Sequence, residues 1–208
     1  MSNTLVYVHD PMCSWCWGFK ATMDSLELSL PEDIAVQRIL GGLAPDSDEP
    51  MPVSMQNMLQ QTWQQIASVV PGTQFNMDFW TKNQPRRSTW PSCRAVIAAK
   101  AQNSDFEIPM IRAIKEAYYL NAKNPSDVDV LTALAEEVGC DADLFRQSIN
   151  SEATHNELQK EIQFARQLGV QGFPSLVFIN TQNQAYGIRV DYNNADTILE
   201  QIEKTNLA

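Results

Sequence analysis

The spacing of apolar residues divides the chain into a β-rich beginning, a long helical middle and a β-rich end. Short runs rich in β-branched and aromatic residues predict four strands, at 5–9, 34–40, 175–180 and 185–190, of which the first is expected to be buried. Residues 181–184 are turn-like, so we expect the last two strands to pair as an antiparallel hairpin. The order of elements is therefore βαβ, a helical segment and ββα.

Helical periodicity, with capping residues and glycines at the ends, predicts the remaining elements. We expect helices at about 13–30, 55–70, 89–102, 107–121, 128–138, 141–149, 152–168 and 194–204. Residues 44–54 contain three prolines and indicate a linker. The pattern predicts an α/β fold in which one discontinuous domain, formed by 1–45 and 169–208, is interrupted by a helical insertion at 46–168.

Composition and charge narrow the class of protein. Of the 208 residues, 44% are apolar, which is enough for a packed core, and the net charge is −10. An acidic surface repels phosphate backbones and anionic lipids, so we expect neither nucleic acid nor membrane as a partner. The first residues, MSNTLVYVHD, lack the basic and apolar regions of a signal peptide, and we expect a cytoplasmic protein.

The stretch PMCSWCWGF contains the clearest chemical signal, a pair of cysteines three positions apart. A structural zinc site needs further ligands at close spacing, but the other candidates are scattered along the chain: His9, Cys93, Cys140 and His155. A structural disulfide across two residues would close too small a loop to stabilise the fold much. The pattern therefore favours a redox-active pair, Cys13 and Cys16.

A strand–loop–helix turn would place Cys13 at the N-terminus of a helix, where unpaired N–H groups and the helix dipole stabilise a thiolate. Cys16 would lie one turn further on and be more buried. It could then attack the mixed disulfide that Cys13 forms with a substrate sulfur. Trp15 stands between the two cysteines, so we expect it on the surface that contacts substrate.

A second signal is the segment VQGFPSLVF, in which Pro174 directly precedes a strong strand. A cis peptide between Phe173 and Pro174 would place the Phe173 backbone against the cysteine pair, where it could hydrogen-bond to a substrate peptide. The alternative is an ordinary trans proline at the start of a strand.

The segments DPMCSWCWGF and GVQGFPSLVF resemble the active-site segment and the cis-proline loop of the DsbA-like branch of the thioredoxin superfamily. The likeness is greatest to its cytoplasmic FrnE-type members and its predicted protein-disulfide isomerases. It implies a thioredoxin fold with a large helical insertion, Cys13 as the attacking thiol, Cys16 as the resolving thiol and Pro174 as the cis-proline. The chain departs from the family at Phe173, which is bulkier than the Val or Thr often found there.

The resemblance implies a thiol–disulfide oxidoreductase or protein disulfide isomerase that works through a mixed disulfide, without a bound cofactor. Its partners would be protein or small-molecule thiols and disulfides, and glutathione could serve as redox partner. One alternative is a glutathione-dependent transferase or isomerase, similar to kappa-class glutathione transferases and 2-hydroxychromene-2-carboxylate isomerases, which use Ser where Cys13 stands. Another is a redox-sensing binding protein. The direction of electron flow depends on the reduction potential relative to the compartment.

Other residues allow two interpretations each. Cys93 lies near a helix start among arginines, and is either a third reactive thiol or a small buried hydrophobe. His9 and Asp10 could tune Cys13 or merely end the first strand. An apolar stripe that includes Met51, Met55 and Met58 is either the core of the insertion or an adaptable surface for clients or a second copy.

Overall fold

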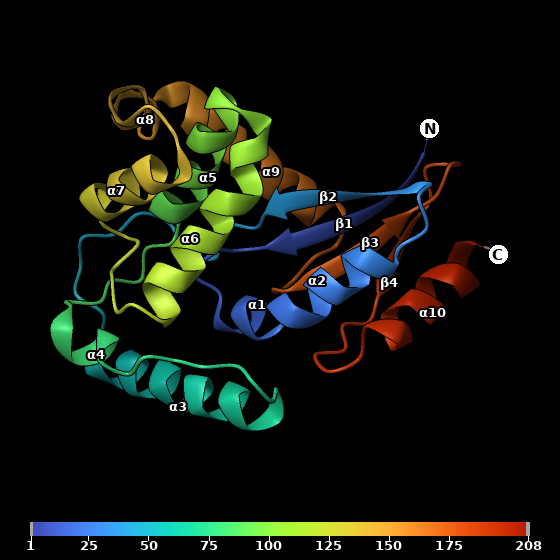
Figure 1. The fold of residues 1–208 in the computed structure, drawn as a ribbon, viewed down its shortest axis with the longest axis horizontal. Coiled ribbons are helices and arrows are strands. Elements are labelled where there is room, and N and C mark those ends of the chain that lie inside the picture. Colours follow the sequence, from blue (N-terminus) through green and yellow to red (C-terminus); the bar gives the residue numbers. More distant parts are fainter. Residues whose placement is uncertain (1, 207–208) are drawn as a thin grey trace.

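The computed structural model describes residues 2–206, which form a mixed sheet covered by helices on both faces (Figure 1). The strands are β1 (Asn3–His9), β2 (Ile34–Leu40), β3 (Ser175–Ile179) and β4 (Ala185–Ile188). They lie in the order β2-β1-β3-β4, with β1 parallel to β2 and antiparallel to β3. The α/β class and the antiparallel β3–β4 hairpin predicted from the sequence are confirmed.

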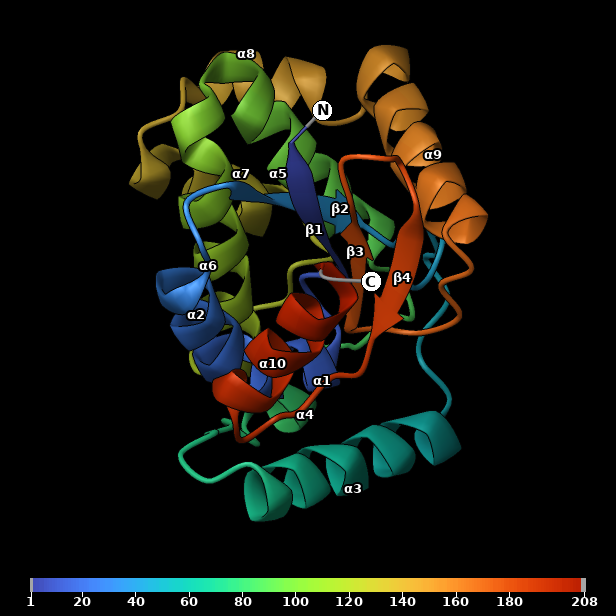
Figure 2. The same cartoon turned by 90° about the vertical axis from the view of Figure 1, so that its right-hand side faces the viewer.

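The central strand β1 sends alternate side chains to opposite faces of the sheet. Leu5 and Tyr7 pack in a core with helices α2 (Lys20–Ser29) and α10 (Ala195–Asn206). Val6 and Val8 pack in a second core with α9 (Glu152–Gln167) on the other face. Figure 2 shows α9 and α10 on either side of the strands. Because β1 is covered on both faces, its sequence is almost continuously apolar.

The first helical segment is divided into two helices, whereas the sequence predicted one. Helix α1 covers Ser14–Gly18, and α2 begins after Phe19. A Cβ atom on Gly18 would lie 2.8 Å from Cγ2 of Ile66, so the glycine lets another helix approach α1 closely at this point. The approaching helix is α3 (Val53–Val69).

The middle of the chain is helical, as its periodicity predicts. Its elements are α3, α4 (Phe79–Lys82), α5 (Trp90–Gln102), the 3₁₀ turn η1 (Ser104–Phe106), α6 (Glu107–Tyr119), α7 (Val128–Val138) and α8 (Ala142–Ser148). Helices α5 to α9 share the largest core cluster, while α3 and α4 pack through an aromatic cluster that contains Trp63 and Tyr119. The apolar stripe with Met51 and Met55 packs on this aromatic cluster, whereas Met58 is exposed.

The division into two domains remains a prediction. Helix α9 is relevant to the position of the boundary between them. Helix α9 lies within the range assigned to the insertion, yet Ala165 and Phe164 pack against the sheet. The same helix also contributes Leu158 and Ile162 to the helical core. Its two apolar faces therefore join the sheet to the helices.

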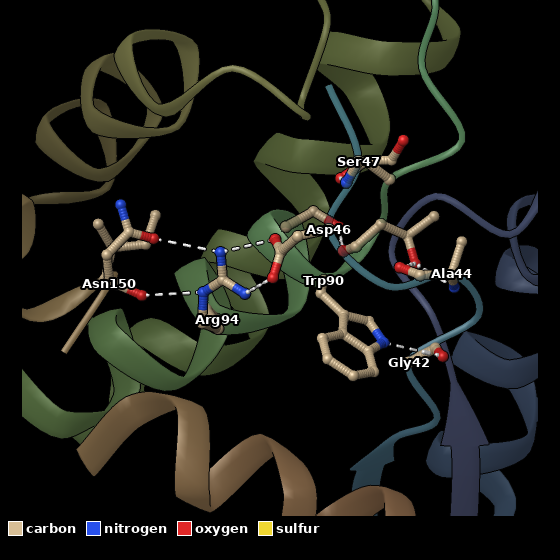
Figure 3. A network of polar contacts seen from close by, with 11 residues as sticks. Gly42, Ala44, Asp46, Ser47, Trp90, Arg94 and Asn150 are labelled. Carbon is tan, nitrogen blue, oxygen red and sulfur yellow. Dashed lines mark hydrogen bonds and ion pairs between the residues drawn. The ribbon is translucent and has the colours of Figure 1, made fainter. Parts of the chain in front are cut away.

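The linker after β2 is fixed to the first turns of α5 (Figure 3). The guanidinium of Arg94, which is mostly buried, donates two hydrogen bonds to the Asp46 carboxylate at 2.8 and 2.9 Å and one to Asn150 Oδ1 at 3.1 Å. The Trp90 indole donates to the Gly42 carbonyl at 3.1 Å. A bidentate Arg–carboxylate pair has a defined geometry, and Arg94 is buried although Asp46 is half exposed, so this linker is held in place.

The carboxylate of Asp10, at the end of β1, joins three segments of the chain. It accepts hydrogen bonds from Met12 N at 2.8 Å, Leu43 N at 2.8 Å and the Thr89 hydroxyl at 2.6 Å. The Cys93 thiol donates to it at 3.4 Å. Burial raises the pKa of the Asp10 carboxyl, and the hydrogen bonds from Thr89, Leu43 and Met12 oppose that rise. Asp10 therefore connects the loop after β1, the linker after β2 and α5.

A second carboxyl joins α9 to the sheet and makes stability depend on pH. Glu161 Oε2 accepts a hydrogen bond from Leu40 N at 2.5 Å. Burial raises the pKa of Glu161 to about 7. Since the folded state then holds this proton at a pH where the unfolded chain has released it, stability falls as the pH rises from the ordinary carboxyl pKa to about 7.

We expect Glu161→Gln to remove this part of the pH dependence, because glutamine stays neutral and can still accept from Leu40 N. At about 1.4 kcal/mol per pKa unit, the wild type should lose on the order of 2–3 kcal/mol more than the variant between about pH 4.5 and pH 7. Urea unfolding of both proteins across this range measures the difference. Parallel stability profiles for the two proteins would contradict the raised pKa of Glu161.

We expect Asp10→Ala to destabilise the protein by about 3 kcal/mol or more, because it leaves the N–H groups of Met12 and Leu43 without their acceptor and the Thr89 hydroxyl with only its longer contact to the Ala44 carbonyl, at 3.4 Å. Asp48→Ala, at an exposed position in the same linker, is the matched control and should change stability by less than about 0.5 kcal/mol. Denaturant unfolding of the two variants tests this. A small effect of both substitutions would show that Asp10 does not hold the three segments.

Candidate functional site

Cys13 lies at the junction of the β1 loop and helix α1. It is the N-cap residue of α1, with φ −79° and ψ 116°, and its N–H donates to the Asp10 carbonyl at 3.0 Å. Its thiol points to the carbonyl oxygen of Phe173, which it approaches to 3.5 Å. The peptide between Phe173 and Pro174 is cis, as predicted. The structure thus brings together two segments that are 160 positions apart in the sequence.

Cys16 lies one helical turn after Cys13 and is fully buried, whereas 6% of the Cys13 surface is exposed. Burial raises the pKa of the Cys16 thiol well above its ordinary value, and a hydrogen bond with Cys13 adds to the rise. All four cysteines are free thiols in this structure. Both thiols are thus largely buried, with Cys13 the more exposed of the two; their roles as attacking and resolving thiols remain a prediction.

The bulky Phe173 is accommodated by the glycine pair at the end of β2. A Cβ atom on Gly41 would overlap the Phe173 ring, so a side chain at this position would displace the ring. Gly42 adopts φ +61°, a backbone conformation that favours glycine. The Gly41-Gly42 pair therefore allows a large aromatic residue to precede Pro174.

A pocket of about 260 Å³ opens beside the Cys13 thiol. Its walls come from the β1 loop, the linker, α3 and α6, and they include Met12, Leu43, Leu59 and Tyr118. Arg86 and Arg87 also line it. Arg86 is paired with Asp127 at 2.5 Å. Arg87 lies close enough to the buried Tyr118 hydroxyl to oppose the rise in its pKa that burial causes. The pocket therefore combines apolar walls, cationic groups and a thiol.

The tryptophans near the cysteines have different environments. Trp15 is half-buried, lines the pocket beside Cys13 and packs against Tyr192, with ring centroids 5.0 Å apart. Trp17 stacks on Tyr119 at 5.3 Å and donates to the Gln74 carbonyl at 2.9 Å. The structure thus places Trp15, Phe173 and Pro174 around the cysteine pair; their contact with substrate remains a prediction.

The other candidate residues are buried. Cys93 has no exposed surface, and both burial and the Asp10 carboxylate raise the pKa of its thiol. This environment favours the buried interpretation over a third reactive thiol. Cys140 packs in the helical core. Asp10 braces the loop, and His9 is fully buried beneath Tyr7, with ring centroids 4.9 Å apart.

Several residues around the pair carried no clear signal in the sequence. Trp63 of α3 donates its indole N–H to the Ser14 hydroxyl at 2.9 Å. Lys115 of α6 donates to the Cys16 carbonyl at 3.4 Å and is 4% exposed. Arg86 and Arg87 line the pocket beside Cys13, whereas the sequence shows them only as arginines near Cys93. All four lie in the helical segment, whose contacts with the cysteine loop depend on the tertiary fold.

Within residues 2–206, no three His, Cys, Asp or Glu side chains gather as a group that could hold a metal ion. In the same part of the chain, none of the helices has the length and apolar character required to cross a membrane.

Comparison with known proteins gives relatives of moderate similarity. The chain is 24% identical over 194 residues to the ClpXP adapter protein SpxH of Bacillus subtilis, covering 93% of this chain and 64% of the relative. It is 24% identical over 185 residues to SpxH of Halalkalibacterium halodurans, covering 87% of this chain and 60% of the relative. The chain thus spans about three fifths of the length of these relatives.

Solved structures share the fold over the whole chain. A candidate protein disulfide isomerase from Nitrosomonas europaea has a TM-score of 0.84 at 24% identity, covering 100% of this chain and 98% of that one. The cytosolic disulfide reductase DsbM from Pseudomonas aeruginosa has a TM-score of 0.77 at 21% identity, covering 99% and 100%. A second DsbM structure contains GSH. The oxidoreductase DsbA from Xylella fastidiosa has a TM-score of 0.64 at 13% identity, covering 100% and 88%.

These likenesses confirm the DsbA-like thioredoxin fold with helical insertion that the sequence predicted. A family model described as thioredoxin matches residues 6–201. The chain therefore belongs to this thioredoxin family.

Proposed function

We propose that this protein is a thiol–disulfide oxidoreductase that works through Cys13 and Cys16. The observation that carries the proposal is the position of the Cys13 thiol, 3.5 Å from the Phe173 carbonyl and beside a pocket, with Cys16 buried one turn behind it. The Phe173 backbone would hydrogen-bond to an extended substrate, which aligns a substrate sulfur with Cys13.

In the reductive direction, the Cys13 thiolate attacks one sulfur of a substrate disulfide and releases the other as a thiolate. Cys16 then attacks the Cys13 sulfur, forms the Cys13–Cys16 disulfide and releases the second substrate thiol. Two external thiols restore the reduced pair. The oxidised pair would run the same steps backwards with a substrate dithiol. Isomerisation of a client would use only the first step, with a client thiol instead of Cys16 resolving the mixed disulfide.

Glutathione is the external thiol that the pocket suits best. One of its carboxylates would pair with the guanidinium of Arg87, since Arg86 already pairs with Asp127, and its cysteine would point to the Cys13 sulfur. DsbM, named as a cytosolic disulfide reductase and also solved with GSH, shares this fold, which supports a reductase in the cytoplasm. A glutathione transferase or isomerase would use the same pocket but would not need Cys16.

A second candidate function is that of a binding protein whose cysteine pair responds to redox state. It is favoured by the relatives named as ClpXP adapters, which align over 93% of this chain. Apolar side chains on α3 are exposed at Val53, Met58 and Val69 and could contact another protein. Such a protein would react once with a disulfide, whereas an oxidoreductase turns over.

We expect the wild type to catalyse the reduction of insulin disulfides by dithiothreitol, and Cys13→Ser to show only the background rate, because serine cannot form the mixed disulfide. Cys140→Ser is the matched control and should retain activity within about twofold, since Cys140 lies in the helical core away from the pair. Insulin precipitation measured by turbidity gives the rates. Absence of turnover by the wild type would reject the oxidoreductase in favour of the binding protein.

We expect Arg87→Gln to raise the KM for glutathione about 5- to 10-fold, because it removes a charge contact worth about 1 kcal/mol. The rate with dithiothreitol, which carries no carboxylate, should not change. Glutathione-dependent reduction of hydroxyethyl disulfide measures the effect, with Arg146→Gln on the exposed surface of α8 as control. Equal KM values for R87Q and R146Q would argue against glutathione in this pocket.

A further inference from the structure

A second crevice, of about 270 Å³, shares no lining residue with the pocket beside Cys13. Its floor is formed by β1 and β2, and its walls by α2 and α6, which lie next to each other in Figure 2. Its rim is exposed at Asp24, Ile108 and Arg112. Its inner end is lined by the buried side chains of Tyr7, His9 and Lys115. The crevice thus leads from solvent to the level of Cys16.

The polar side chains at the inner end of the crevice do not form hydrogen bonds with each other. Within residues 2–206, the Tyr7 hydroxyl and both ring nitrogens of His9 are buried without a hydrogen-bond partner. Lys115 Nζ makes its contact with the Cys16 carbonyl at 3.4 Å and forms no ion pair in this part of the chain. Unmatched buried polar groups are costly, so their retention indicates a role.

Resolution of the mixed disulfide requires a group that accepts the proton of Cys16. Cys16 is fully buried and must lose a proton before its sulfur can attack the mixed disulfide. Cys13 is then bonded to the substrate sulfur and cannot accept that proton. Among the basic side chains at the inner end of the crevice, Lys115 is the one that contacts Cys16. Its amine donates to the Cys16 backbone carbonyl at 3.4 Å and lies near enough to the Cys16 thiol for a charge there to act on it. Burial favours the uncharged amine, because it lowers the pKa of Lys115.

We infer that Lys115 accepts the proton of Cys16 during resolution of the mixed disulfide, and that the crevice between α2 and α6 returns this proton to solvent. This inference rests on the proposed oxidoreductase function. The proton moves from Cys16 Sγ to the neutral Lys115 Nζ, which leaves a thiolate beside an ammonium. The thiolate attacks Cys13 Sγ, the Cys13–Cys16 bond forms, and the bond to the substrate breaks. The substrate leaves as a thiolate and takes a proton from water.

Other charged groups around the crevice are engaged elsewhere. Lys20 pairs with Asp24, Arg38 with Glu27, and Arg112 with Glu116. The titratable and charged side chains that line the crevice with Lys115 are Tyr7, His9, Lys20, Asp24, Arg38 and Arg112. Burial lowers the pKa of His9, and the positive charge of Arg38 lowers it further, so the ring is held neutral. It is the competing acceptor, and the test must separate it from Lys115.

The reaction of the reduced protein with 5,5′-dithiobis(2-nitrobenzoate) separates the two thiols. Attack by Cys13 releases a first equivalent of thionitrobenzoate, and resolution by Cys16 releases a second. In stopped-flow absorbance, we expect Lys115→Gln to leave the first phase unchanged and to slow the second about 100-fold at neutral pH. Its second phase should then rise with hydroxide concentration, whereas that of the wild type should level off. An unchanged first phase also shows that the variant is folded. If Lys115→Gln does not fold, Lys115→Met provides the same test.

Lys115→Arg distinguishes a proton acceptor from a fixed positive charge. Arginine stays protonated, so we expect this variant to be as slow as Lys115→Gln in the second phase. A second phase at the wild-type rate in either variant would overturn the assignment, as would a large slowing by His9→Phe alone. A wild type that releases only the first equivalent would instead remove the oxidoreductase function on which the inference rests.

Discussion

The carboxylate of Asp10 holds together three segments from distant parts of the sequence. Its two oxygens accept from the loop after β1, from the linker after β2 and from the first residue before α5. Because Met12 and Leu43 are fixed by the same group, Cys13 starts its helix at a set distance from the linker. The linker in turn carries Gly41, against which the Phe173 ring rests. The contact between the Cys13 thiol and the Phe173 carbonyl therefore depends on this one buried group.

The two cysteines face different parts of the molecule. Cys13 faces the Phe173 carbonyl and a pocket with cationic groups, whereas Cys16 faces the sheet and α6. This asymmetry follows from the short helix α1, whose one turn separates an edge position from a buried one. The Cys13 thiol lies beside the pocket, and Lys115 contacts the Cys16 carbonyl. In the proposed mechanism, the different roles of Cys13 and Cys16 therefore follow from their different burial.

The sequence was sufficient for the elements whose signals are local. The strand at 34–40 and the helix at 128–138 have the predicted bounds, because β-branched runs and helical periodicity depend on near neighbours. The cysteine spacing and Pro174 likewise pointed to the site. Lys115 could not be found in this way, since a lysine on an amphipathic helix is ordinarily exposed and its contact with Cys16 spans 99 positions. The close approach of Ile66 to Gly18 likewise depends on a partner that is distant in the sequence.

The hydrogen bond from Trp63 to Ser14 and the contact of Lys115 with Cys16 have a consequence for engineering. Thioredoxin-like scaffolds are attractive as small domains, and the helical insertion here would be an obvious segment to delete. Deletion would open the start of α1 to water and remove the side chain that touches the resolving cysteine. It would also strip apolar cover from Met12, which packs with Trp63 and Tyr119. A minimal version of this protein must therefore be redesigned around the cysteine helix, and truncation alone would not produce it.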